Sequence, residues 1–208
     1  MNKSRVELFS DGVFAIVLTL LVLNLKVPVA HGLGSLREVA PALLVHAASF
    51  FLVGVLWMAH HAALARVDRI PYRALLLNLL ALFWVTLLPF AAENAAERPL
   101  EPLGASLVAF SCGAYVMSFL AMRLASHSTI DDMPEMRRWK QLRMVMAACL
   151  ICGNFACAIL AWLSPWLGYA AGLTTIAVFL VLRSPSEVED LFRQQAARVG
   201  PAGFEPAT

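Results

Sequence analysis

Charged residues are scarce in this sequence. Only 14% of its 208 residues are Asp, Glu, Lys or Arg, whereas 60% are hydrophobic. Since soluble domains carry about 25% charged residues, this composition excludes a soluble globular protein and predicts an all-α integral membrane protein whose main partner is the lipid bilayer. The net charge of +2 is too weak to indicate a nucleic-acid partner.

The motifs of common enzyme active sites are also missing. No GxSxG elbow, HExxH zinc motif or phosphate-binding glycine loop occurs in the sequence. Cys149 and Cys152 have a redox spacing, but they lie in an apolar helix without the βαβ context of such motifs. Apolar runs hold all the cysteines, which favours small core residues over disulfides: Cys112, Cys149, Cys152 and Cys157. The sequence therefore predicts no enzyme and no resident cofactor.

The histidines do not form a metal site. His46 and His60 share a helical face about 21 Å apart, a spacing that suits stacked haems, but no second helix supplies matching ligands. His60 and His61 point about 100° apart on a helix, so one helix cannot turn both onto one metal. We expect one of this pair to hydrogen-bond inside the bundle and the other to lie at the cytoplasmic boundary.

Six apolar segments are long enough for membrane-spanning helices, so residues 1–183 are predicted to form one transmembrane domain. Pro41 is expected in the first turn of the second span and Pro89 near the far end of the third, before an acidic loop over 93–101. Residues 184–208 are predicted to form a short cytoplasmic helix and a loose tail. The spans are predicted at about 8–25, 40–63, 74–92, 103–122, 142–163 and 166–182.

An even number of spans puts both termini on one side of the membrane. Thirteen of the sixteen Lys and Arg residues would lie on that side. The opposite side would hold only Lys26, Arg37 and Arg98. The positive-inside rule therefore predicts that both termini are cytoplasmic. The localisation that we expect for this multi-pass protein is the cell membrane.

The first span carries the one acid expected at membrane depth, Asp11. Such a residue is costly unless it is paired or faces water or protein, although a short helix with Asp11 snorkelling to the interface fits equally well. Gly12, Ile16, Thr19 and Leu23 form one stripe at helical spacing, with Leu20 beside it. This stripe alone does not distinguish a pore from an ordinary helix–helix seam.

Several short strings resemble one known family. Arg5-x-x-x-Phe9-Ser10-Asp11, followed by Ala15-Ile16 and Thr19-Leu20-Leu21, is similar to the first-helix motif of the lysosomal potassium channel transmembrane protein 175 and its single-repeat prokaryotic homologues. The match covers about residues 5 to 90. Three further strings fit the second and third spans of that family: Trp57-x-x-His60-His61, Asn78-Leu79 and Leu88-Pro89-Phe90.

The resemblance implies a potassium-permeable homotetrameric cation channel, with potassium ions as the permeant species and six helices per subunit. The TVGYG filter of ordinary potassium channels is absent from this sequence. By resemblance, Ile16, Leu20 and Leu23 of the first helix would form an apolar constriction, with Thr19 as the polar neighbour.

We further expect a polar network that packs the first helix against the second and serves structure or gating. Such a network would satisfy the buried charge of Asp11, and it would include one of His60 and His61. The residues of the expected network are Arg5, Phe9, Ser10, Asp11, Trp57, His60 and His61.

Three other function classes remain open, one of which is a purely structural membrane protein. A secondary transporter or proton-coupled carrier would show saturable flux that depends on Asp11 beyond its effect on folding, although the sequence lacks the internal repeats usual in such proteins. A membrane enzyme or haem protein would carry absorbance or metal when purified, and the residue inventory argues against it.

Overall fold

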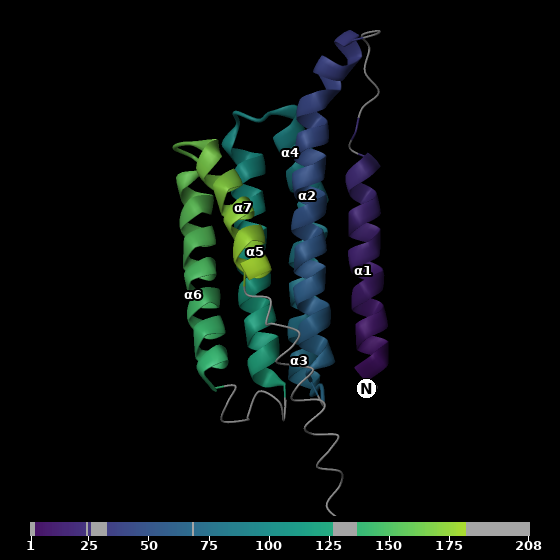
Figure 1. Cartoon of the computed structure of the whole chain (residues 1–208), viewed down its shortest axis with the longest axis vertical. Coiled ribbons are helices and arrows are strands. Elements are labelled where there is room, and N and C mark those ends of the chain that lie inside the picture. Colours follow the sequence, from purple (N-terminus) through teal and green to yellow (C-terminus); the bar gives the residue numbers. More distant parts are fainter. Residues whose placement is uncertain (1–2, 24, 26–32, 68, 127–136, 182–208) are drawn as a thin grey trace, which may run out of the picture.

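The fold is a bundle of α-helices that run side by side, as a computed structural model shows (Figure 1). The structure describes residues 3–23, 25, 33–67, 69–126 and 137–181. Within these ranges seven helices follow one another. They are α1 (Lys3–Leu23), α2 (Leu33–Ala65), α3 (Tyr72–Thr86), α4 (Leu88–Glu97), α5 (Pro102–Ala125), α6 (Arg137–Leu160) and α7 (Pro165–Val181).

The helices are apolar enough for a bilayer. Five helical segments are long and apolar enough to cross a membrane, with α3 and α4 counted together as Tyr72–Glu97, and Pro165–Leu180 is a shorter apolar helix. This confirms the all-helical prediction and its membrane character. The exact number of crossings and the cytoplasmic side of the termini stay predictions, and the predicted helix and tail at 184–208 lie outside the described residues.

The third predicted span is broken in two. Pro89 is the second residue of α4. Because a proline has no amide hydrogen and its ring crowds the carbonyl four residues earlier, a continuous helix cannot pass through this position undisturbed. The chain turns at Leu87, whose amide donates to Trp84 O at 3.3 Å. Beyond the break, α4 runs to Glu97, so the acidic connection is shorter than the predicted loop over 93–101.

The second helix begins earlier than predicted. It starts at Leu33 and holds Pro41 in its interior instead of its first turn. A proline there leaves the carbonyl of Arg37 without its helical partner. Figure 1 shows this end of α2 rising beyond the neighbouring helices, where water can bind that carbonyl.

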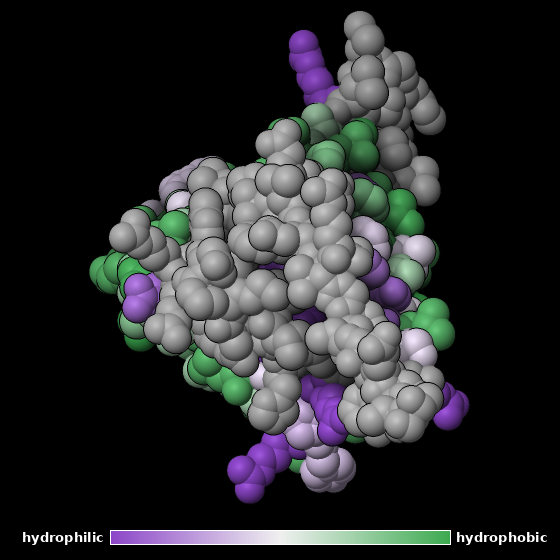
Figure 2. Space-filling model, turned by 60° about the horizontal axis from the view of Figure 1, so that its bottom comes forward, coloured by the Kyte–Doolittle hydropathy of each residue, from purple (hydrophilic) through white to green (hydrophobic). Residues whose placement is uncertain are grey.

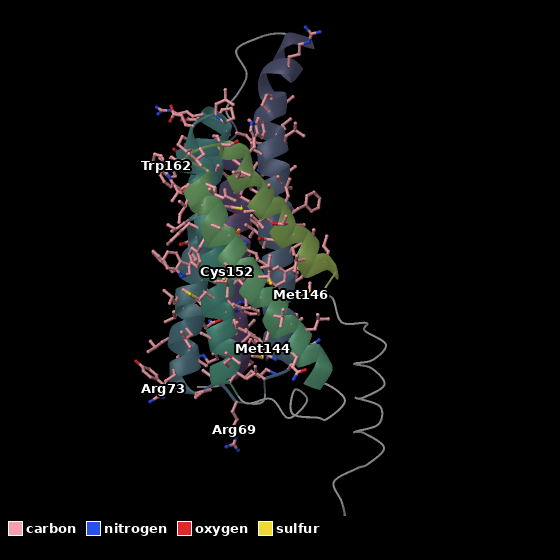
Figure 3. All side chains as sticks on the ribbon, turned by 90° about the vertical axis from the view of Figure 1, so that its left-hand side faces the viewer. Arg69, Arg73, Met144, Met146, Cys152 and Trp162 are labelled. Carbon is pink, nitrogen blue, oxygen red and sulfur yellow. The ribbon has the colours of Figure 1, made fainter. Side chains whose placement is uncertain are left out.

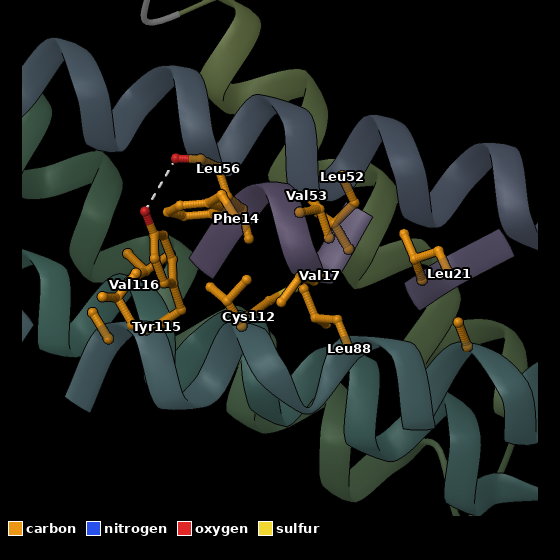
Figure 4. Close-up of a cluster of buried hydrophobic side chains, with 14 of the residues drawn as sticks. Phe14, Val17, Leu21, Leu52, Val53, Leu56, Leu88, Cys112, Tyr115 and Val116 are labelled. Carbon is orange, nitrogen blue, oxygen red and sulfur yellow. Dashed lines mark hydrogen bonds between the residues drawn. The ribbon is translucent and has the colours of Figure 1, made fainter. Parts of the chain in front are cut away.

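A hydrophobic core joins the buried side of α1 to α2, α4 and α5 (Figure 4). Phe14, Val17 and Leu21 of α1 are at most 2% exposed. Of the cysteines, Cys112 lies in this core, whereas Cys149 and Cys152 are exposed and all four are free thiols. The prediction of core cysteines is therefore wrong for these two, because α6 lies at the edge of the bundle and turns them outward.

Basic side chains cap α2 at the end of the bundle where the N-terminus lies. Lys3 Nζ donates to Ala65 O at 3.0 Å and Arg123 Nη1 donates to Ala63 O at 2.8 Å. Carbonyls in a last helical turn lack helical partners, and cations there complement the helix dipole. Figure 2 turns this end toward the viewer, with hydrophilic residues in purple at its rim and hydrophobic residues in green on the flanks.

Helices α5 and α7 touch backbone to backbone at Gly168. A Cβ built on Gly168 would lie 2.5 Å from the carbonyl oxygen of Ala105. Real side chains do not come this close, so the two helices pack at this distance only because residue 168 is glycine. Next to this contact, Ser106 Oγ of α5 donates to Ala158 O of α6 at 2.8 Å.

We predict that Gly168→Ala destabilises the protein by about 1–3 kcal/mol, because the added methyl group forces α7 away from α5. The measurement is thermal unfolding of the purified protein in detergent. Gly153→Ala on α6 is the matched control, since a Cβ at Gly153 meets nothing within 4 Å; it should stabilise slightly or not at all. Equal unfolding temperatures for the two variants would contradict this packing.

Candidate functional site

Helix α1 has two distinct faces. Its buried face is formed by Val6, Ser10, Phe14, Val17 and Leu21. On its other side, the predicted stripe is uncovered: the side chain of Ile16 is 61% exposed and that of Leu23 is 75% exposed. Gly12, Thr19 and Leu20 are exposed with them. A single subunit therefore leaves this whole stripe free for lipid, for a second copy or for a pore.

Polarity within the stripe separates α1 from an ordinary lipid-facing helix. Thr19 Oγ donates to Ile16 O at 2.8 Å, within its own helix. This bond uses the one hydrogen of the hydroxyl and leaves its lone pairs for a donor or a cation on the exposed side. Gly12 adds open space, since a Cβ there would meet nothing within 4 Å.

A buried hydrogen bond fixes α1 to α3. Asn78 Nδ2 donates to Ser10 Oγ at 3.1 Å, and both side chains are completely buried. An amide and a hydroxyl are costly inside an apolar bundle unless they bind each other or a further partner. The bond therefore sets the register and rotation at which α1 meets α3.

A second bond fixes α1 to α2. Trp57 Nε1 donates to Asp11 Oδ1 at 2.8 Å. Asp11 is half-buried, so the indole supplies a charge-assisted hydrogen bond to a carboxylate in an apolar helix. The ring of His61, itself exposed, lies 5.8 Å from that of Trp57, centroid to centroid.

The neighbouring histidine belongs to a different set of contacts. His60 is 1% exposed, and its Nδ1 lies 3.3 Å from Tyr115 Oη of α5. Tyr115 Oη in turn donates to Leu56 O at 3.1 Å (Figure 4). Which atom donates between His60 Nδ1 and Tyr115 Oη depends on the tautomer of the imidazole ring. The ring of Phe14 packs against His60 at 5.4 Å and so brings α1 onto this pair.

The expected single network is therefore divided among three helices. Asp11 binds Trp57 of α2, as expected of that pair, but Ser10 binds α3. His60 hydrogen-bonds Tyr115 and not Asp11, because it is on the side of α2 that faces α5. Arg5 and Phe9 are exposed, outside these hydrogen bonds.

Sequence reasoning assigned no site role to Asn78 or Tyr115. Asn78 was part of a motif string only, yet an amide inside an apolar run is itself a signal, because it must find a partner. Tyr115 gave a similar signal, with a hydroxyl in the middle of α5. Their hydrogen-bond partners depend on how the helices pack against each other. The spacing of residues along one helix does not determine that packing.

No metal centre is seen in the part of the chain that the structure describes. No group of three or more His, Cys, Asp and Glu side chains there is placed to hold an ion. The candidate site is thus the exposed stripe of α1 together with the polar contacts behind it that fix its orientation.

Comparison with known proteins gives this arrangement a context. A profile of the family described as the endosomal/lysosomal potassium channel TMEM175 matches residues 5–89. A potassium channel of Chamaesiphon minutus is 33% identical over 138 residues, which cover 63% of this chain and 68% of the relative. A potassium channel of a Chryseobacterium species is 39% identical over 113 residues, or 52% of this chain and 59% of the relative.

Vertebrate relatives are longer. The endosomal/lysosomal proton channel TMEM175 of Bos taurus is 38% identical over 114 residues, which cover 49% of this chain but 24% of that protein. The matched stretch thus spans under two thirds of the length of several of these relatives.

A solved structure extends the similarity beyond the matched family region. The crystal structure of a lysosomal potassium-selective channel TMEM175 homolog from Chamaesiphon minutus matches with a TM-score of 0.57 and 27% identity. It covers 88% of this chain and 98% of the other. The likeness therefore includes most of the helices that lie outside residues 5–89.

We predict a measurable coupling between Ser10 and Asn78. In a double-mutant cycle of Ser10→Ala and Asn78→Leu, unfolding should give a coupling free energy of about 0.6 kcal/mol and at most about 1.7 kcal/mol, typical of interhelical hydrogen bonds in membranes. The control cycle pairs Ser10→Ala with Asn94→Leu, since Asn94 Nδ2 donates to Phe90 O within its own helix. It should show no coupling; a Ser10–Asn78 coupling indistinguishable from this control would contradict the assignment.

Proposed function

Because the chain belongs to the TMEM175 family of ion channels, we propose that it is a potassium-permeable cation channel of the cell membrane. The pore is lined by α1 from each subunit of a homotetramer, and both termini are cytoplasmic. One observation carries this proposal: α1 has an uncovered stripe with a polar Thr19 among apolar side chains, while polar bonds fix its opposite face.

The chemistry of the stripe suits a hydrophobic constriction. Rings of Ile16, Leu20 and Leu23 from several subunits would exclude water at the narrowest points and so control conduction by dewetting. Thr19 lone pairs next to Ile16 would replace part of the hydration shell that a potassium ion loses there. The pore would need no carbonyl filter, in keeping with the absence of TVGYG from the sequence.

The potassium assignment follows the names of the bacterial relatives, which are called potassium channels. The family region, residues 5–89, holds nearly all of α1 and the whole of α2 and α3. This region contains the stripe and its anchoring residues, so the proposed pore lies in the best-matched part of the chain.

Proton conduction is the second candidate, since the vertebrate relatives are named proton channels. A secondary transporter or proton-coupled carrier is the third. The break between α3 and α4 resembles the interrupted helices of transporters, but it has no counterpart among the other described helices. A carrier would show saturable flux, whereas a channel would not.

The test is ion flux in liposomes with an imposed potassium gradient. We predict that the wild-type protein passes potassium faster than sodium and that Ile16→Asn changes the rate or the potassium-to-sodium ratio, because an amide hydrates the constriction. Ile159→Asn on α6 is the matched control, since Ile159 is similarly exposed, at 73%, on the far side of the bundle; it should leave both quantities unchanged.

Three results would count against the proposal. A well-folded wild-type protein that passes no ions at several pH values and voltages would remove its main support. Saturable flux that Asp11→Asn abolishes without unfolding the protein would favour the carrier. Identical effects of Ile16→Asn and Ile159→Asn would show that α1 does not line the pathway.

A further inference from the structure

The turn between α6 and α7 carries a cluster of exposed apolar side chains. Trp162 is 66% exposed, Leu163 is 82% exposed and Trp166 is 64% exposed. Ser164 is the one polar residue among Ala161–Trp166. We call Trp162, Leu163 and Trp166 the hairpin tip. Large apolar groups that protrude from a turn are costly in water, so something covers them.

The backbone of the turn does not need water. The amides of Trp162 and Leu163 donate to carbonyls three residues earlier at 3.2 and 2.9 Å, and the amide of Ser164 donates to Leu160 O at 3.1 Å. A turn that hydrogen-bonds internally is tolerated below the water phase, where an open loop is not.

The tip lies on the side of the bundle away from α1. In Figure 1, α6 and α1 form opposite edges of the molecule. Figure 3 looks onto the α6 side and shows Trp162 toward one end, Cys152 midway, and Arg69 and Arg73 at the other end. This side is exposed and apolar along α6, with Cys149, Cys152 and Ile159 among its exposed residues, as expected of a surface that faces acyl chains.

Contacts near the tip place it at the membrane surface. Tyr169 Oη of α7 donates to Pro99 O in the α4–α5 connection at 3.1 Å. The same connection carries the exposed ion pair between Arg98 Nη1 and Glu101 Oε2, at 3.3 Å. The charged side chains of Arg98 and Glu101 and the apolar indole rings of the tip thus lie at the same end of the bundle. Charged groups and tryptophan rings occur together at the depth of the lipid headgroups.

We propose that Trp162 and Trp166 anchor the hairpin in the headgroup–glycerol layer of the leaflet opposite the N-terminal end. The indole rings lie against the first acyl carbons, and their N–H groups donate to ester or phosphate oxygens of the lipids. The tip has no formal charge, so it binds zwitterionic and anionic lipids equally. This surface is separate from the pore proposed above and does not depend on ion conduction.

Lipid fits the tip better than a protein partner does. Protein interfaces surround an apolar centre with a polar rim, whereas residues 144–181 contain no Asp, Glu, Lys or Arg. The exposed apolar surface continues from the tip along α6, and no charged residue interrupts it. One occupant, the bilayer, therefore covers both the tip and this surface of α6.

The test uses quenching of tryptophan fluorescence by brominated lipids in proteoliposomes. Lipids brominated near the ester end of the acyl chain should quench more of the emission than lipids brominated near the terminal methyl group. In the double variant Trp162→Phe/Trp166→Phe, quenching by the shallow probe should fall about two-fold. It should be the same in phosphatidylcholine vesicles and in vesicles with added phosphatidylglycerol.

Trp84→Phe is the matched control, because Trp84 lies away from the tip, half-buried, with its ring 4.9 and 5.5 Å from those of Phe83 and Phe110, centroid to centroid. It should leave quenching by the shallow probe nearly unchanged. Phenylalanine keeps the apolar character of each site, and the elution volume in gel filtration verifies that each variant is folded.

Two outcomes would overturn the proposal. If acrylamide in the water phase quenches the tip tryptophans while both brominated lipids leave them unaffected, the tip lies in water and the bilayer does not cover it. If the deep probe quenches them more than the shallow one, the hairpin is buried in the hydrocarbon and is not an interfacial anchor.

Discussion

A carboxylate in an apolar helix must have a hydrogen-bond donor, and the rest of the structure depends on how this protein meets that requirement. Trp57 of α2 supplies the donor for Asp11 at 2.8 Å, and one residue earlier Ser10 accepts from the buried Asn78 of α3. Two bonds from adjacent residues to two different helices, together with the buried apolar side chains of Phe14, Val17 and Leu21, orient α1 about its axis. The face that remains exposed is therefore the one away from these contacts.

That orientation gives the bundle two unlike sides. On the α1 side, Ile16, Thr19, Leu20 and Leu23 are uncovered by any element of the described chain. On the α6 side, a continuous apolar surface ends in the two tryptophans of the hairpin tip. Close packing at Gly168 holds α7 on α5, which also carries α6. The α1 side is suited to contact other subunits around a symmetry axis, whereas the α6 side is suited to face the lipid bilayer.

Sequence patterns predicted the helical membrane fold because composition and run length depend little on tertiary packing. They placed Asp11 and Trp57 in one expected network between the first two helices, and these two residues are hydrogen-bonded in the structure. They missed the partners of Ser10 and His60, because Asn78 and Tyr115 lie on helices whose placement only packing determines. The break at Leu87 was missed because a proline near a helix end and a proline that starts a new helix look alike in sequence.

The central claim is that the uncovered face of α1 meets the ion pathway. The most direct measurement is thiol accessibility at Ile16→Cys and Leu20→Cys, in a background whose native cysteines are replaced by alanine, with potassium flux recorded during treatment by a membrane-impermeant thiol reagent. The account predicts that modification at both positions blocks flux and that bound potassium-like cations slow the modification. Full labelling at both positions with unchanged flux would contradict it.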